Sequence, residues 1–494
     1  MNDDPAALLP ELLLVLAAVA GLLAGSWLPR DRQWVVRLIA CAACVAGVTA
    51  AVVDLTRPVQ RVFDDTYVVD VGLGVVRIVV LTSILLTVGL SVDRFAATTR
   101  ETELYVLLLL GGLGTIVLAG ANDLLLLVAA YLLASIPLYA LTGIARTGPG
   151  AEAAMKYYLL GALSGVTMLV GVTLLFGVGG STQYAELARA LPGAPRAVVA
   201  VGLVAVLAGL LFKVGAVPLH FWVPDVVQGA TTPVAAFVAT VPKIGGLWAL
   251  YRLLSTALST SALDWSLLVA VLAAVTMTLG NLAAFFQDDV RRLLAYSTVS
   301  QVGYLLMAVA AADRAVLAPP ALGCYLAAYA VTNLGAFAVV AALPRAHTLA
   351  DYRGVGTRHR WLALSLVVCL LGLIGTPPTA VFVGKLTVFT AAIDAGLAWL
   401  AVVAVLNTMA SVFYYLRWIL PVFRGSDPAA RDRREPHGGV VGTAAACDTR
   451  RSRHGAAGGG SGTAVRAART AHCAAAASLL LGVAAGPVLA VLAV

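Results

Sequence analysis

The stretch AGLLFKVGAVPLHFWVPD, residues 208–225, places a lysine inside an apolar run and then breaks that run with a proline. Lys213 has only apolar or small neighbours on both sides, and Pro218 follows five residues later. Because proline removes a backbone hydrogen bond from a helix interior, the run cannot continue as one regular helix. A basic group beside a helix break in apolar surroundings calls for an explanation, which the rest of the chain supplies.

The composition of the whole chain is that of a multi-pass membrane protein. Of its 494 residues, 61% are hydrophobic and 12% are charged, whereas soluble domains carry about 25% charged residues. Apolar runs of about 20 residues, enough to span a bilayer, recur along the chain, so we predict an all-α fold with about fourteen transmembrane helices. These runs lie near 6–28, 34–54, 71–92, 103–119, 123–143, 155–178, 197–219, 231–255, 264–286, 293–311, 318–343, 361–392, 397–423 and 473–494.

Two of the runs are interrupted at corresponding places. Pro218 breaks one, which the segment 218–228 continues, and GTPPT at 375–379 breaks the run at 361–392. Each break falls in the fourth helix of a block of five, and an odd-numbered repeat must be inverted, so we predict two inverted five-helix repeats. The predicted organisation is a three-helix segment (1–102), a first repeat (103–260), a second repeat (261–423), a disordered basic cytoplasmic loop (424–472) and a C-terminal transmembrane helix (473–494).

The arginines predict the orientation of these helices. With the N-terminus outside, inward loops hold 20 arginines and outward loops hold 5, and without the 424–472 loop the balance is 11 against 5. Basic residues gather in cytoplasmic loops, and an even number of helices then places both termini outside. The first apolar run follows the acidic stretch MNDDP, so we expect a retained helix rather than a cleaved signal peptide.

The lysines give the sequence its clearest functional signal. The chain contains 29 arginines but four lysines, which are Lys156, Lys213, Lys243 and Lys385, and all four lie within or at the edge of apolar runs. Arginine keeps its proton in proteins, whereas a buried lysine can release one. Ionisable groups inside the membrane are functional candidates, and proton relays are one of their uses. This pattern therefore predicts a proton path.

Other interpretations of these residues stay open. Lys156 stands at the start of its predicted run and could extend to the inner interface. Lys213, Lys243 and Lys385 could form structural pairs with carboxylates, although acidic residues are scarce in these runs. His220 follows the break at Pro218 and could pass a proton between Lys213 and Lys243, but a lone histidine near a helix break is more often a packing residue.

Several other classes of function lack their sequence signals. Cys41 and Cys44 form a CxxC pair without a second pair, which favours helix packing over a metal site. The loop at 424–472 is rich in Gly, Ala and Arg, but no lysine follows its glycines as a phosphate loop requires. We find no Walker A motif, dinucleotide fingerprint, nucleophile elbow or nucleic-acid-binding module. We therefore predict no metal, no cofactor and no nucleic acid for this chain, whose surroundings are the lipid bilayer.

Four motifs resemble a known family. They are MKYYLLGALSG (155–165), FKVGAVPLHFWVPDVVQGATTPVAAFVATVPKIGG (212–246), QDDVRRLLAYSTVSQVGYLL (287–306) and TPPTAVFVGKL (376–386), and they resemble the antiporter-like membrane subunits of respiratory complex I, the NADH–quinone oxidoreductase. The resemblance covers roughly residues 100–425. The expected helix number and the lysine at 385, where another subunit type has glutamate, favour one subunit type within the family.

The resemblance implies a role and partners. Electron transfer from NADH to quinone would take place in other subunits, which would hold the quinone, FMN and iron–sulfur clusters, and this chain would be a non-redox, proton-translocating subunit in the inner membrane of a bacterium. Lys156, Lys213, Lys243 and Lys385 match family positions on a central polar axis. Lys213 would be the central proton holder, Lys243 the connecting group and Lys385 the exit-side group.

One position departs from the family pattern. The family has a glutamate three residues before the serine of the motif that reads SIPLY (135–139) here, and this position is Leu132. An opposite charge at that place would favour the ammonium form of Lys213. Its absence favours one alternative to the pump, a structural subunit that has lost pumping. A second alternative keeps the fold but belongs to another complex: a subunit of a multi-chain cation/proton antiporter or membrane hydrogenase.

Overall fold

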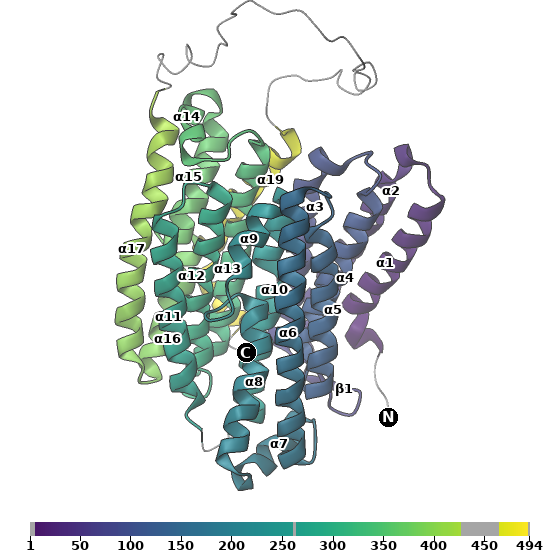
Figure 1. Ribbon diagram of the computed structural model, residues 1–494, viewed down its shortest axis with the longest axis vertical. Coiled ribbons are helices and arrows are strands. Elements are labelled where there is room, and N and C mark those ends of the chain that lie inside the picture. The colour runs from purple at the N-terminus through teal and green to yellow at the C-terminus, as the bar shows by residue number, and fades with distance from the viewer. Residues whose placement is uncertain (1–4, 260–262, 426–463, 493–494) are drawn as a thin grey trace, which may run out of the picture.

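The computed structural model describes residues 5–259, 263–425 and 464–492. Their regular structure is helical, apart from one hairpin of the strands β1 (Gln60–Val62) and β2 (Tyr67–Val69). The long helices lie roughly side by side along the long axis of the molecule (Figure 1). They are α1 (Leu9–Trp27), α2 (Trp34–Asp54), α3 (Val71–Phe95), α4 (Glu101–Gly120), α5 (Leu124–Thr142), α6 (Gly148–Gly179), α8 (Arg196–Val214), α10 (Thr232–Arg252), α11 (Trp265–Phe285), α12 (Val290–Ala310), α13 (Ala318–Ala342) and α17 (Ala398–Phe423).

Shorter elements complete the bundle. The short helices are α7 (Tyr184–Ala190), α9 (Trp222–Gly229), α14 (Val355–Arg358), α15 (Arg360–Ile374), α16 (Ala380–Asp394), α19 (Val465–Val483) and α20 (Ala485–Leu492). In the described part of the chain, twelve helices are long and apolar enough to cross a membrane, and the bent pair α19 and α20 is a possible thirteenth. The predicted run at 361–392 is divided between α15 and α16, so the count of about fourteen stays a prediction.

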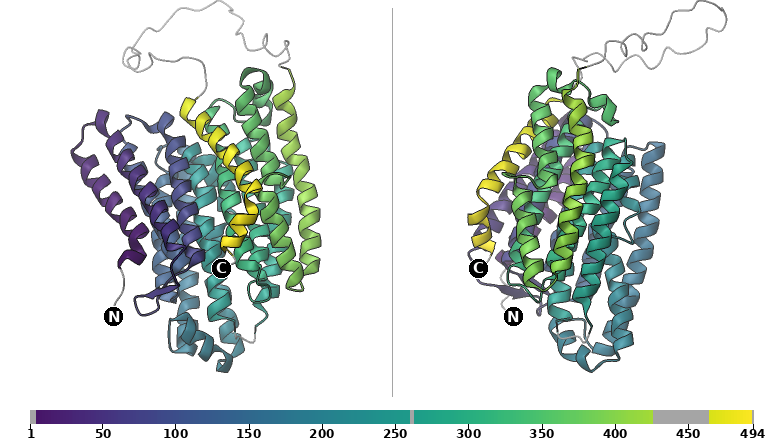
Figure 2. Two further views of the ribbon diagram at one scale, coloured as in Figure 1. Left: turned by 180° about the vertical axis from the view of Figure 1, so that it is seen from behind. Right: turned by 90° about the vertical axis from the view of Figure 1, so that its left-hand side faces the viewer.

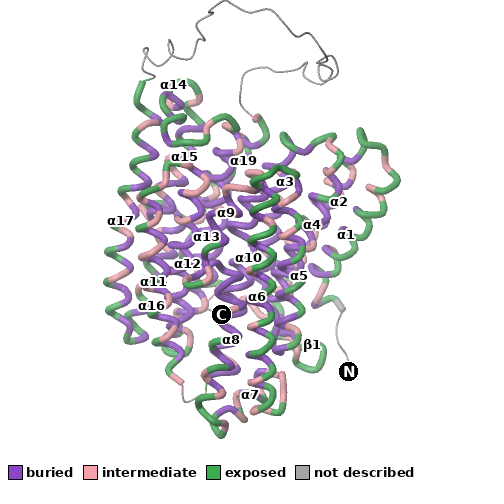
Figure 3. Tube along the Cα trace, in the orientation of Figure 1, coloured by how far each residue is buried: buried purple, intermediate pink, exposed green. Residues whose placement is uncertain are grey.

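Three helices form the centre of the bundle. The most apolar stretches of α10 and α12 are each 94% buried and that of α13 is 83% buried, whereas the value for α2 is 28%. Figure 3 shows the same gradient from a buried centre to exposed outer helices. Small residues allow close approach here: a Cβ on Gly280 of α11 would collide with the backbone of Ser300 in α12, as is usual where membrane helices pack tightly. The polar residues of these central helices therefore lie inside protein rather than in lipid.

Both predicted helix breaks are confirmed. Helix α8 ends at Val214 and α9 begins at Trp222, while α15 ends at Ile374 and α16 begins at Ala380. A glycine in the left-handed region terminates the first half of each broken helix, namely Gly215 (φ +75°) and Gly375 (φ +90°). This conformation suits glycine because it has no Cβ, and the prolines that follow prevent the helix from continuing. The inverted relation between the two repeats stays a prediction.

Two predicted boundaries differ from the structure. Helix α6 begins at Gly148, seven residues before the predicted run, because Thr147 caps it and a proline occupies its first turn. The last helix begins at Val465, inside the predicted 424–472 loop. Its first residues, VRAARTAH, form helix although their hydropathy is low, so the apolar run alone placed the start of the helix too late. Residues 426–463 of that loop lie outside the described residues. Helix α19 begins at the end of the bundle where α1 ends, and it runs toward the end where α1 begins (Figure 2).

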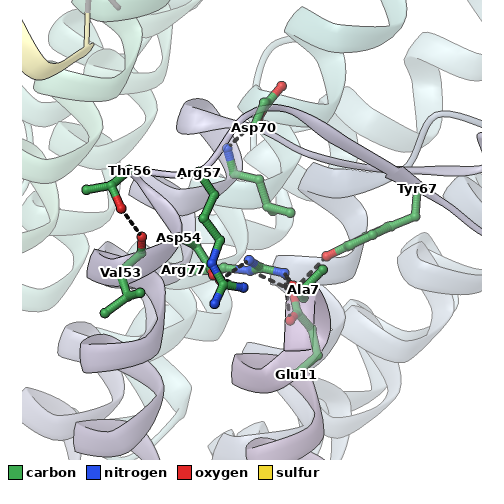
Figure 4. A network of polar contacts seen from close by, with 10 residues as sticks. Ala7, Glu11, Val53, Asp54, Thr56, Arg57, Tyr67, Asp70 and Arg77 are labelled. Carbon is green, nitrogen blue, oxygen red and sulfur yellow. Dashed lines mark hydrogen bonds and ion pairs between the residues drawn. The ribbon is translucent and has the colours of Figure 1, made fainter. Parts of the chain in front are cut away.

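A buried ion network joins the first three helices and the hairpin (Figure 4). Arg77 of α3 is fully buried, and its Nε and Nη2 each donate to the Glu11 carboxylate over 2.8 Å. Its Nη1 donates to Asp54 Oδ2 over 3.0 Å, and the hydroxyl of Tyr67 donates to Glu11 Oε1 over 2.7 Å. Glu11 thus accepts hydrogen bonds from both Arg77 and Tyr67.

Candidate functional site

Lys213 is a buried amine in the last turn of α8, just before the first break. Its Nζ donates a hydrogen bond of 2.8 Å to Ser135 Oγ of α5 and lies 5.6 Å from the centre of the Tyr131 ring. Within the described ranges, Lys213 forms no ion pair with a carboxylate. A hydroxyl and an aromatic face therefore take the place of a counter-ion.

Lys243 lies near the middle of α10 and is also fully buried. Its Nζ has no hydrogen-bond partner among the described residues, and the nearest aromatic contact is the ring of Trp222, 5.3 Å away. A Cβ placed on Gly215 would lie 3.8 Å from this Nζ. The amine of Lys243 is therefore located beside the break that ends α8.

Lys385 occupies the second break in a different way. It lies in the second turn of α16 and is buried, yet its Nζ donates to Ile374 O over 2.8 Å and approaches Leu373 O at 3.4 Å. These carbonyls belong to the last turn of α15, where backbone acceptors have no helical partner. The ring of Tyr304 lies 4.2 Å from Nζ. The amine thus caps the broken helix at its negative end.

His220 and Lys156 are placed differently from these three lysines. His220 lies within the first break, is buried, and its Nδ1 has no partner in the described part of the chain. No hydrogen bond joins its ring to Lys213 or Lys243. The side chain of Lys156 is 47% exposed and forms ion pairs with Glu152 (2.8 Å) and Asp225 (3.0 Å). The structure therefore gathers Lys213, Lys243 and His220 at one break, Lys385 at the other, and Lys156 outside both.

Polar side chains of the central helices lie between the two breaks. Thr240 is one turn before Lys243 on α10, and its hydroxyl accepts a hydrogen bond of 2.9 Å from Asn333 Nδ2 of α13. The same Nδ2 donates to the hydroxyl of Tyr329 over 3.2 Å, which lies 3.2 Å from Thr298 Oγ1 of α12. The single proton of the Tyr329 hydroxyl also has Ala239 O as an acceptor at 2.8 Å, so it serves one of these two acceptors at a time. Polar contacts within hydrogen-bond distance therefore lead from the helix of Lys243 to α12.

A second group of polar contacts continues from α12 to Lys385. Gln301, one turn after Thr298, donates from Nε2 to Leu373 O over 2.9 Å, the carbonyl that Lys385 also approaches. The hydroxyl of Tyr325 donates to Gln301 Oε1 over 2.6 Å. Neither Gln301 nor Tyr329 was predicted as a site residue from the sequence. The spacing of polar residues on α12 and α13 could have indicated them, because Tyr329 and Asn333 are four residues apart and so share one helix face.

Leu132, which replaces a family glutamate, lies on the outer side of α5. Its side chain is 45% exposed, whereas Tyr131 and Ser135 of the same helix are buried and approach Lys213. The residue that contacts the amine from α5 is therefore Ser135.

Metal-binding geometry is not found in the described ranges, which contain no group of three or more His, Cys, Asp or Glu side chains suited to hold an ion. Cys41 and Cys44 are free thiols of α2 that are at least partly buried, which agrees with a packing role for this pair.

Comparison with known proteins decides the family. Residues 121–411 match the model of the family described as NADH:quinone oxidoreductase/Mrp antiporter, TM. The chain belongs to this family. NADH-quinone oxidoreductase subunit N 1 of Streptomyces griseus is 58% identical over 86% of this chain and 90% of its own length. NADH-quinone oxidoreductase subunit N of Mycobacterium sp. (strain JLS) is 50% identical over 98% of this chain and 97% of its own length.

Solved structures of the antiporter-like family share the fold. A chain of respiratory complex I from Thermus thermophilus with bound aureothin has a TM-score of 0.79 at 30% identity, covering 97% of this chain and 98% of that chain. A chain of the Mrp complex from Dietzia sp. DQ12-45-1b has a TM-score of 0.83 at 22% identity, over 99% and 97% of the two chains. The subunit type favoured by Lys385 and by the expected helix number is subunit N, which is confirmed by the names of the two relatives. All five predicted site residues lie within the matched range 121–411.

Proposed function

We propose that this chain is a proton-translocating membrane subunit of a bacterial NADH–quinone oxidoreductase. The observation that carries this proposal is the placement of Lys213, Lys243 and Lys385 beside the two helix breaks, as buried amines without carboxylate partners among the described residues. An amine that is neither paired nor exposed is costly as a fixed ion, so a task that uses its proton explains its presence. Oxidation of NADH and reduction of quinone take place in partner subunits, and this chain contributes the proton path.

The proton path follows the polar residues between the breaks. Lys213 holds a proton against Ser135, Lys243 receives it beside Gly215, and Lys385 releases it at the second break. Thr240, Asn333, Tyr329 and Thr298 line the way from α10 to α12, and Gln301 leads on to the carbonyl beside Lys385. Water completes this path, because Lys243 Nζ, Asn333 Oδ1, Ser300 Oγ and His220 Nδ1 are buried polar atoms without partners among the described residues, and such atoms ordinarily bind water.

His220 is proposed to exchange protons with this path at the first break. It is buried within the loop between α8 and α9, which holds both Gly215 and Pro218. Because no hydrogen bond joins its ring to Lys213 or Lys243, and its Nδ1 has no partner among the described residues, the exchange runs through water. Replacing His220 with Phe keeps an aromatic ring and removes both nitrogens, and we expect slower proton uptake with unchanged assembly.

The arginine distribution supports an orientation in a bacterial plasma membrane. The inward loops of the sequence analysis join α1 to α2, α3 to α4 and α5 to α6, at the end of the bundle opposite the β1–β2 hairpin (Figure 1). With that end in the cytoplasm, α1 begins and α19 ends on the outer side (Figure 2). Both termini are then outside.

The experiment that tests the proposed function is removal of the central amine. In the assembled complex reconstituted into vesicles, Lys213→Ala should lower the number of protons moved per NADH oxidised, while quinone reduction continues in the partner subunits. Arg314→Ala is the matched control, because it removes an exposed cation paired with Asp264 (3.1 Å) and should leave the ratio unchanged. An unchanged ratio in Lys213→Ala would overturn the pumping role of this chain.

Leu132 supports a second candidate function, a structural subunit of the same complex that no longer pumps. Lys213→Ala separates the two. If the chain pumps, Lys213→Ala lowers the proton ratio. If pumping has been lost, Lys213→Ala leaves the ratio unchanged, and so does Leu132→Glu, because position 132 lies on the outer side of α5, away from Lys213. The third alternative, an antiporter or hydrogenase subunit, predicts that the purified complex has no NADH oxidation coupled to quinone.

A further inference from the structure

Helix α9 connects the exterior of the protein with the buried lysines. It has eight residues, Trp222–Gly229, and isolated helices shorter than about 12 residues are marginal in water. Its position therefore depends on its contacts with the surrounding helices, against which five of its eight residues are buried. The first turn carries both Trp222, which is buried, and Asp225, which is partly exposed.

Trp222 of α9 contacts the surroundings of both lysines. The indole Nε1 of Trp222 donates a hydrogen bond of 2.9 Å to Phe212 O, in the residue directly before Lys213. Its ring lies 5.3 Å from Lys243 Nζ and stacks on Tyr157, with centroids 4.3 Å apart and an angle of 15° between the rings. A shift of Trp222 would therefore change the surroundings of both amines at once.

Asp225 of α9 belongs to an ion cluster that we call the Asp225 cluster, formed by Lys156, Asp225, Gln228 and Arg292. Asp225 Oδ2 lies 3.0 Å from Lys156 Nζ of α6, and Asp225 Oδ1 lies 3.1 Å from Arg292 Nη1 of α12. The same Nη1 donates to Gln228 Oε1 over 3.0 Å. One carboxylate of α9 thus joins a helix of the first predicted repeat to a helix of the second.

The contacts of Lys156 favour a role in positioning α9 over a role in transferring a proton. Its side chain is 47% exposed and already bonded to two carboxylates, whereas the three buried lysines have none within the described ranges. Each exposed pair contributes up to about 1 kcal/mol. These three contacts add to the apolar packing of α9, in which Val223, Val226 and Val227 are fully buried, and they involve both Asp225 and Gln228.

We propose that Lys156, Asp225 and Arg292 are positioning residues, which hold α9 so that Trp222 lies against Lys243 and Phe212. Lys156 then acts through its fixed positive charge and does not have to release its proton. This inference rests on the proposed function and adds a specific coupling to it: a change at the exposed cluster, which includes a residue of the second repeat, reaches the lysine pair of the first.

The test compares two substitutions of one residue in the assembled complex. Lys156→Arg keeps the charge and the ion pair but cannot release a proton, and we expect a proton-to-NADH ratio equal to that of the unchanged complex. Lys156→Met removes the charge, and Asp225→Asn removes the shared acceptor; both should lower the ratio toward the value of Lys213→Ala. Glu152→Gln is the matched control, because Glu152 pairs with Lys156 from the same helix, α6, and it should have no effect.

A second readout separates this inference from the proposed function. Hydrogen exchange of the backbone amides of α9 should become at least severalfold faster in Lys156→Met and Asp225→Asn, but not in Lys156→Arg or Glu152→Gln. Equal loss of pumping in Lys156→Arg and Lys156→Met would show that Lys156 carries a proton and would overturn the inference. Unchanged exchange and unchanged pumping in Asp225→Asn would overturn it as well. If Lys213→Ala has no effect while the exchange pattern holds, the proposed function fails and the positioning role stands.

Discussion

Arg77 and Lys213 are both fully buried cations, but their surroundings differ in kind. Arg77 donates to the carboxylates of Glu11 and Asp54 and joins three helices at the hairpin (Figure 4). Lys213 donates to the hydroxyl of Ser135 at a helix break, with no ion pair within the described residues. Arginine keeps its proton in proteins, so its network is permanent. Lysine without a counter-ion can take either protonation form.

This difference shows how one chain can use two basic residues for separate tasks. Where a charge must stay, in the network of the first three helices, the chain uses an arginine with enough acceptors to compensate it. Where the proposed function requires a proton to leave, the chain has a lysine, and no carboxylate among the described residues pairs with it. The proposed function would account for the absence of lysine from the loops and its presence in the apolar runs. Substitutions of Arg77 and of the residues around the buried lysines test this contrast.

The largest effect on stability is expected for Arg77→Met. This change leaves Glu11 and Asp54 buried without their shared partner, and breaking a buried ion pair from one side costs about 3–5 kcal/mol. The control Arg57→Met removes a partner of Asp54 that is 39% exposed and 3.5 Å away, so it should cost up to about 1 kcal/mol. Denaturant unfolding of the purified chain in detergent measures both. Equal losses in the two variants would show that the buried network has no special role.

A smaller effect is expected at the second break for Gly375→Ala. Alanine at φ +90° is strained, which costs about 1–3 kcal/mol, and its Cβ would lie 2.9 Å from Lys385 Cδ. Gly396→Ala is the matched control, because Gly396 has φ +78° and, among the described residues, no atom within 4 Å of the added Cβ. Both should lose stability in the same unfolding assay, but only Gly375→Ala should also lower proton pumping. Unchanged proton pumping in Gly375→Ala would show that Lys385 is not part of the proton path.

The smallest effect is expected for Ser135→Ala, which removes the hydrogen bond between Ser135 and Lys213. Such a bond contributes about 0.5–1.5 kcal/mol when neither partner is charged and about 1.5–3 kcal/mol when one is. If Lys213 is not held as a permanent ion, the loss should fall in the lower range. Ser164→Ala serves as a control, since its hydroxyl donates to Leu160 O of its own helix. A loss of stability near that of Arg77→Met would contradict the contrast.

Several features of the site could be predicted from the sequence because they are local. Pro218 and the pair Pro377 and Pro378 mark both breaks, since proline interrupts a helix wherever it stands in the interior. The four lysines stand out by type and position alone, and three of them are buried beside the breaks as the apolar runs suggest. Hydropathy predicts which residues are buried in the bundle, and this was sufficient to predict the buried lysines and the broken helices.

Other features depend on which way each helix faces, and hydropathy does not contain that information. Arg77 finds Glu11 and Asp54 across 66 and 23 residues of sequence, and Lys156 finds Asp225 across 69. Leu132 was expected beside Lys213 but is 45% exposed, because Tyr131 and Ser135 occupy the inward side of α5. These pairings are set by the rotation of packed helices, so they appear only once the helices are assembled.

The central claim is that Lys213 works by releasing its proton rather than by its charge, and Lys213→Arg tests it most directly. Arginine keeps the charge and the ability to donate to Ser135, yet it cannot give up its proton. The measurement is the number of protons moved per NADH oxidised by the assembled complex in vesicles. The account predicts that Lys213→Arg lowers this ratio as far as Lys213→Ala does. A ratio equal to that of the unchanged complex would contradict it.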